Sequence, residues 1–154
     1  MPRNRTAVIA GVSTVIAIGA VAAFTVPAAS DWYHHRHDEA SSYKTAAEAK
    51  ADRASFPRWI PDGATSVAYE MKTTGGDRLL KATLPSASMP AGCTPYKPTA
   101  NLPGPALKAD WFPKDAAAKP TARCGLYYTF LDGNTLYGWQ SNTDWIAENK
   151  AGSK

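Results

Sequence analysis

The chain has 154 residues and a formal net charge of +4, with 17 basic residues against 13 acidic ones. This length suits one small domain with connecting segments and leaves little room for a second core. The Lys and Arg residues form no cluster, and nucleic-acid binding needs a basic face that neutralises several phosphates. We therefore expect no nucleic-acid partner.

The first predicted element is a membrane span over 7–26, a run of twenty uncharged residues that follows Arg3 and Arg5. A helix of that length rises about 30 Å, enough to cross the hydrocarbon core of a bilayer. By the positive-inside rule, residues 1–6 stay in the cytoplasm and everything after Val26 is exported. The exported part then keeps a net charge of +2, from 15 basic and 13 acidic residues.

A cleaved secretory signal is the alternative for the same run. Small residues at 27–30 suit cleavage before Asp31, which would release a secreted domain. Signal h-regions usually span about 7 to 15 residues, so this longer run favours an uncleaved anchor in the lipid bilayer. The expected location is the cell membrane, single-pass, with the C-terminal domain outside the cytoplasm.

Residues 27–55 read as a polar helical stalk. Asp38 is a possible helix cap, and the segment 44–54 mixes alanines with charged residues of high helix propensity. No apolar stripe runs along it, so it has no face to bury against a core. The sequence predicts a solvent-exposed spacer that ends at Pro57.

The segment 56–154 is predicted to be a β-rich exported domain. Residues 67–72 alternate apolar and polar, residues 73–77 supply a turn, and 78–84 resume as a second strand. A second hairpin is predicted from Cys124 to Phe130, with a turn at 132–134 and a return strand over 135–140. The expected fold class is α+β: a transmembrane helix and helical stalk, then about four antiparallel strands in two hairpins. A short capped helical turn at 142–146 follows.

The two cysteines, Cys93 and Cys124, both fall in the exported part and are most simply a disulfide. This bridge would pin the connection 85–123, which holds eight of the twelve prolines, to the sheet. Long connections without regular structure are either functional or loose. Trp111 and Phe112 are the expected apolar anchor of this connection. Two free thiols are the alternative reading of the cysteine pair.

All three histidines, His34, His35 and His37, lie just after the predicted span. They are weak candidates for a transition-metal site or for a pH-dependent contact with anionic headgroups, while polar flanks are routine at this position. The β-rich domain consequently holds no imidazole for a Ser-His or Cys-His pair. Its carboxylates fall mostly at turns and caps, so we expect no enzyme, no catalytic residues, no bound metal and no cofactor.

Aromatic residues are the one enrichment with an evident use. Tyr127, Tyr137 and Trp139 are expected to share a sheet face, opposite Leu136, and to form an exposed binding patch. Aromatic side chains stack on sugars and anchor protein interfaces. The alternative is that these residues fill the core.

Four short strings, at 59–64, 73–75, 90–93 and 109–113, together with the Ala-rich composition and the short basic N-terminus, give the chain a family likeness. It resembles small membrane-anchored exported proteins of high-GC Gram-positive bacteria. The resemblance implies a setting and carries over no catalytic residue.

The function expected from the sequence is therefore a non-enzymatic interaction module of the cell envelope that contacts another envelope protein. One alternative is a carbohydrate-binding module for cell-wall glycan, using the patch of Tyr137 and Trp139. A further alternative is a small envelope hydrolase that uses carboxylates.

Overall fold

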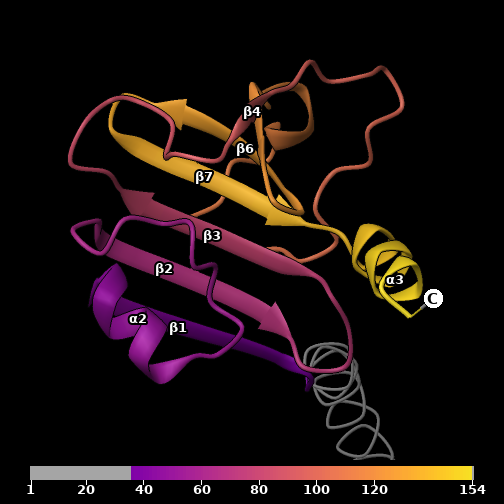
Figure 1. The fold of residues 1–154 in the computed structure, drawn as a ribbon, viewed down its shortest axis with the longest axis horizontal. Coiled ribbons are helices and arrows are strands. Elements are labelled where there is room, and N and C mark those ends of the chain that lie inside the picture. Colours follow the sequence, from indigo (N-terminus) through magenta and orange to yellow (C-terminus); the bar gives the residue numbers. More distant parts are fainter. Residues whose placement is uncertain (1–35, 154) are drawn as a thin grey trace, which may run out of the picture. The chain divides into compact units, whose positions relative to one another are not determined.

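The computed structural model describes residues 36–153, and the predicted span over 7–26 lies outside them. The described part contains one seven-stranded antiparallel sheet in the order β1-β2-β3-β7-β6-β5-β4 (Figure 1). The strands are β1 (Asp38–Thr45), β2 (Thr65–Lys72), β3 (Arg78–Thr83), β4 (Thr94–Pro95), β5 (Ala122–Cys124), β6 (Tyr127–Asp132) and β7 (Thr135–Gln140). Between residues 36 and 153, no helix has the length and apolar character needed to cross a bilayer.

Both predicted hairpins are confirmed. β2 and β3 pair antiparallel across the turn 73–77, and the guanidinium of Arg78 donates to the turn carbonyl of Gly75 at 2.7 Å. β6 and β7 pair across the second turn, where Gly133 adopts a φ of +59° that favours glycine. The local signals of alternation and turn chemistry were sufficient to find both.

The predicted strand from Cys124 to Phe130 is two strands. It breaks at Gly125 and Leu126, where Gly125 has a φ of +60°, and the chain turns back to pair β5 with β6. β4 then pairs with β5 at the edge of the sheet. With β1, these additions raise the predicted four strands to seven.

The predicted polar stalk over 27–55 is wrong where the structure describes it. Residues 38–45 form β1, which pairs with β2 from Asp38↔Lys72 to Thr45↔Thr65, so Asp38 opens a strand and caps no helix. The helix α2 (Ala46–Asp52) follows, capped by Thr45, whose hydroxyl accepts from the amide of Glu48.

α2 is packed against the sheet and does not stand in solvent. Ala46 and Ala49 have no exposed surface, and the Ala46 amide donates to the Ala64 carbonyl at 2.8 Å. Two alanines one turn apart are a narrow face, but their small side chains let the helix approach the sheet closely. This is why the absence of a wide apolar stripe misled the prediction.

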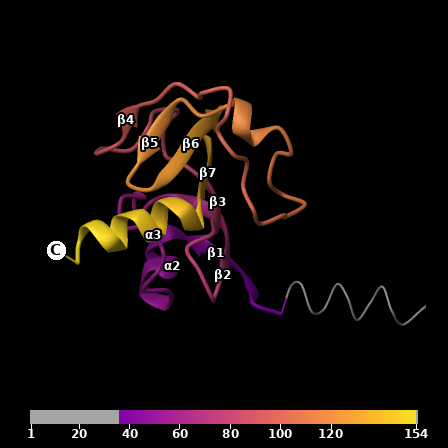
Figure 2. The same ribbon diagram turned by 90° about the vertical axis from the view of Figure 1, so that its right-hand side faces the viewer.

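The sheet is covered on both faces (Figure 2). On one face, α2 and the segment 53–64 cover the strands with a cluster that includes Phe56, Ile60, Tyr69, Leu80, Tyr127 and Leu136. On the other face, the connection between β4 and β5 supplies Leu107, Phe112 and Ala116, which pack on Leu79, Phe130 and Trp139. The three-residue 3₁₀ helix η1 (Ala116–Ala118) belongs to this cover.

The predicted disulfide is confirmed: Cys93 and Cys124 are bonded across a separation of 31 residues. It joins the start of the connection to β5. The predicted anchor also holds, because Phe112 is buried and Trp111 is half-buried against the same cluster. The connection is thus attached at both ends and in its middle.

The C-terminal helix is longer than predicted. α3 (Asn142–Ala151) has ten residues, and Ser141 is its N-cap in place of Asn142. The Asn142 side chain instead accepts from the amide of Gly76 at 2.8 Å, and its backbone amide donates to Asp77 at 2.9 Å. These bonds attach the first turn of α3 to the β2–β3 turn, and the helix buries no residue fully.

Candidate functional site

The exposed aromatic patch predicted from Tyr127, Tyr137 and Trp139 is wrong. Trp139 has no exposed surface and Tyr127 is 4% exposed. The two residues also lie on opposite faces of the sheet, because Trp139 pairs with Tyr128 while Tyr127 packs in the cluster of Leu136. Tyr127 belongs to the core on one face of the sheet, and Trp139 belongs to the core on the other.

The predicted orientation of the β7 side chains is correct, but the predicted exposure of Trp139 to solvent is not. Tyr137 and Trp139 do point away from Leu136, as expected for alternate residues of β7. β7, however, lies between β3 and β6, and Phe112 of the connection covers it with ring centroids 5.9 Å from Tyr137 and 6.4 Å from Trp139. Tyr137 is half-buried and stacks on Phe130.

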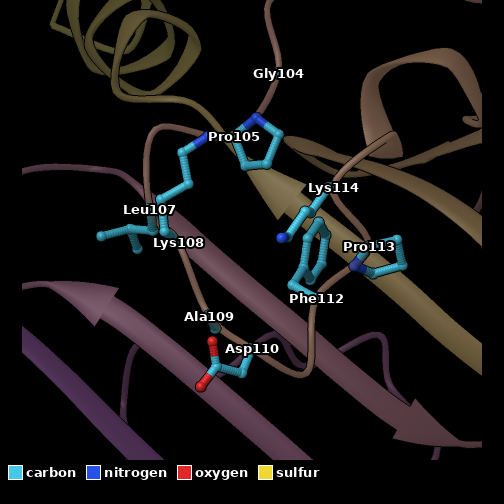
Figure 3. Close-up of a pocket in the computed structure, with 9 residues that line it drawn as sticks. All are labelled: Gly104, Pro105, Leu107, Lys108, Ala109, Asp110, Phe112, Pro113 and Lys114. Carbon is cyan, nitrogen blue, oxygen red and sulfur yellow. The ribbon is translucent and has the colours of Figure 1, made fainter.

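The described part offers a different candidate contact surface, a cavity of about 600 Å³ in the connection itself (Figure 3). We call it the connection groove. Its lining residues are Gly104, Pro105, Leu107, Lys108, Ala109, Asp110, Phe112, Pro113 and Lys114.

The wall of the connection groove is held by the sheet face that the connection covers. Phe112 is 6% exposed and Leu107 is 4% exposed, and both pack in the cluster of Trp139. The Phe112 amide donates to the Ala109 carbonyl at 3.0 Å, and the Ala116 amide to the Pro113 carbonyl at 3.3 Å. The prolines fix their own φ angles. The groove is therefore a shaped feature of the fold.

Three charged side chains lie along the groove, and all three residues are exposed. In Figure 3, the Lys108 side chain runs toward Pro105 and the Lys114 side chain ends beside the Phe112 ring, while Asp110 lies at the opposite end of the lining residues. Within residues 36–153, neither lysine makes an ion pair. Lys119, a few residues on, differs because it pairs with Asp115 at 3.0 Å, and this hydrogen bond lowers the pKa of the Asp115 carboxyl.

A second polar cluster is structural. The guanidinium of Arg123 stacks 3.9 Å from the centre of the Tyr128 ring and pairs with Asp144 at 3.4 Å. Burial raises the pKa of Tyr128, and its hydrogen bond with Asp144 raises it further. These contacts tie the first turn of α3 to β5 and β6, which accounts for all three residues.

The histidines and carboxylates form no composite site in the described chain. His34 and His35 lie outside the described residues, and only His37 is within them. Across 36–153 no three His, Cys, Asp or Glu residues are placed to hold a metal. Asp77, Asp115 and Asp144 each have a structural partner, in Asn142, Lys119 and Arg123.

Lys108 and Lys114 are not among the candidate residues that the sequence predicts. The only signal was indirect: the proline-rich connection was long enough to be either functional or loose. That two lysines six residues apart flank one hollow depends on the path between them, which no periodic pattern encodes. Comparison with protein-family models, with curated proteins and with solved structures found no match for this chain.

Proposed function

We propose that this chain is a single-pass membrane protein whose exported domain is a non-enzymatic interaction module of the cell envelope. Residues 7–26 are the anchor in this proposal. The connection groove is the surface that meets a partner protein.

The observation that carries the proposal is that the long connection is fixed in place. A connection of this length is either functional or loose. This one is tied by the bond between Cys93 and Cys124 and anchored by Phe112, and the amide of Tyr96 donates to Thr121 at 2.9 Å where its ends meet. Looseness is therefore a poor account of its length, and a binding role is the better one.

Three features support the location. The uncharged run over 7–26 is long enough to span, and Arg3 and Arg5 precede it. The disulfide suits an oxidising compartment outside the cytoplasm. The resemblance to small anchored proteins of high-GC Gram-positive bacteria agrees with both.

The alternative of glycan binding loses the exposed pair on which it rested, because Trp139 is buried under Phe112 and Tyr137 is half-buried. The carboxylate hydrolase also gains no support, since Asp77, Asp115 and Asp144 are engaged in turns, caps and ion pairs. A protein contact at the groove uses exposed groups that the fold leaves unengaged.

Site-specific photo-crosslinking in intact cells tests the contact. A photoreactive residue is placed at Ala106, which is exposed beside the groove, and the matched control is placed at Asn134, exposed in the β6–β7 turn. We expect an adduct with one envelope protein from position 106 and none from position 134. Identical adducts from both positions, or none from either, would reject the groove as a contact surface.

Membrane fractionation with N-terminal sequencing tests the anchor. The protein should sediment with membranes and retain residues 1–30, since the run is long for a cleaved signal. A mature chain that starts near Asp31 would contradict the anchor and make this a secreted domain.

A further inference from the structure

We propose that the connection groove binds a peptide segment that carries a carboxylate beside an apolar side chain. This inference rests on the proposed interaction function and names the chemistry of the partner. The observation behind it is that the groove combines an apolar wall with charged side chains that have no ion pair among the described residues.

The apolar part of the groove suits one side chain of the partner. Phe112, Leu107, Pro105 and Pro113 contribute carbon surface to a hollow of about 600 Å³. Small-ligand sites typically enclose about 300 to 1,000 Å³ and have mostly apolar walls with a few polar groups. The Phe112 ring is held from behind by Trp139 and Tyr137, so an occupant meets a preformed wall.

The lysines select an anion. Lys108 and Lys114 both line the hollow, with Lys108 beside Pro105 and Lys114 beside Phe112 (Figure 3). Neither has an ion pair among the described residues. A carboxylate between them replaces water on two ammonium groups with charge-assisted hydrogen bonds, which are stronger than neutral ones. Complementary charge also speeds the encounter and fixes the orientation of the partner.

Asp110 favours a peptide over a densely anionic surface. Its carboxylate lies at the end of the groove away from the lysines and repels the closely spaced phosphates of an anionic lipid headgroup layer (Figure 3). A peptide places backbone N–H donors a few ångströms from its side-chain carboxylate, and Asp110 can accept from them. A peptide therefore matches both the two lysines and the single aspartate along the groove.

The test is a binding titration on the full chain purified in detergent. The probe is a fluorescent six-residue peptide of alternating glutamate and leucine, and the comparison peptide has glutamine in place of glutamate. The variants are Lys108→Gln, Lys114→Gln and the matched control Lys97→Gln, which removes an exposed lysine of the same connection outside the groove. Partition of a given peptide into micelles is the same for the native chain and for every variant, so differences among the chains report binding to the protein.

We expect the glutamate peptide to bind the native chain, and each groove variant to bind it about tenfold more weakly. Lys97→Gln should bind as the native chain does, and Asp110→Asn should keep binding the glutamate peptide. Equal binding of the two peptides, equal weakening by Lys97→Gln, or binding of inorganic phosphate or anionic vesicles in preference to the peptide would overturn the inference. If the crosslink at position 106 persists while the peptide fails, the proposed function stands and this inference alone falls.

Discussion

Single residues determine how the elements meet, and Gly76 is the clearest example. A Cβ at this position would meet the Cβ of Trp145 at 2.2 Å, so only glycine lets α3 lie against the β2–β3 turn. The same glycine accepts a hydrogen bond from Gln140 at 2.6 Å through its carbonyl. One residue without a side chain thus lets β7, α3 and the turn meet.

The ionisation of Tyr127 is coupled to folding. Burial raises the pKa of its phenol well above the ordinary 10.0, and the neighbouring Tyr69 raises it further. In the unfolded chain the phenol ionises near its ordinary pKa, while in the folded chain it stays protonated to higher pH. The stability that depends on this proton is complete below about pH 10 and is lost as the pH rises toward the folded value.

The variant Tyr127→Phe tests this coupling. Urea unfolding is measured at about pH 8 and at about pH 11, and the native chain should lose stability between them. The variant should lose less over the same interval, after an initial cost at about pH 8 of roughly 0.5 to 1.5 kcal/mol for the missing hydroxyl. Disulfide exchange at alkaline pH affects both chains, so the difference between their slopes reports Tyr127. Identical slopes would contradict the assignment.

At the scale of elements, the structures that could be predicted from the sequence are those formed by residues close together in the chain. Both hairpins could be predicted because alternation and turn residues lie within a dozen residues of each other. The strand β1 could not, because its pairing with β2 spans the whole of α2 and the segment after it. The helix propensity of the alanines was real, yet it placed α2 without indicating that Ala46 and Ala49 would be buried.

The solvent exposure of a side chain is harder to predict than its orientation in a strand, and Trp139 shows why. Its orientation opposite Leu136 follows from the period of a strand, but its burial depends on Phe112, 27 positions earlier in a connection with no periodic pattern. The candidate groove has the same origin. Its lysines line one hollow because Phe112 and the disulfide fix the path of the connection, and such long-range contacts leave no local signal.

The disulfide is the element-scale constraint with the largest expected effect. In the loop-closure model a bridge across 31 residues contributes about 3 to 4 kcal/mol to stability. The double variant Cys93→Ala/Cys124→Ala should lose that amount of unfolding free energy and therefore unfold at a lower urea concentration. Reductant should destabilise the native chain to a similar degree and leave the double variant unchanged. A native chain indifferent to reductant would contradict the stabilising role.

At the scale of the domain, one sheet is enclosed by covers of different kinds. α2 and the segment 53–64 close one face, and an irregular connection closes the other. The strands at the two ends of the sheet are guarded against further pairing: β4 has two residues and includes Pro95, and β1 carries Glu39 and Lys44. The irregular cover, by contrast, presents the exposed charged residues of the connection groove.

The extent of the folded unit follows from this arrangement and gives the last prediction. β1 and α2 contribute Tyr43, Ala46 and Ala49 to the core cluster on their face, so the unit begins near residue 38. A chain of residues 36–154 should unfold cooperatively in urea and form its disulfide. A chain of residues 56–154, which starts where the sequence alone placed the domain, should expose Phe56, Ile60 and Tyr69 and lose the cooperative transition.

Amide hydrogen exchange on the longer chain makes the comparison specific to these elements. Protection in β2 should be high because β1 and β3 both pair with it, and removing residues 36–55 should abolish that protection first. Lys44→Gln in the longer chain is the control, since this exposed side chain of β1 lies outside the cluster. If residues 56–154 instead retained the full transition and the protection of β2, then β1 and α2 would contribute nothing to the folded unit. The spacer predicted from their polar composition would then describe them better.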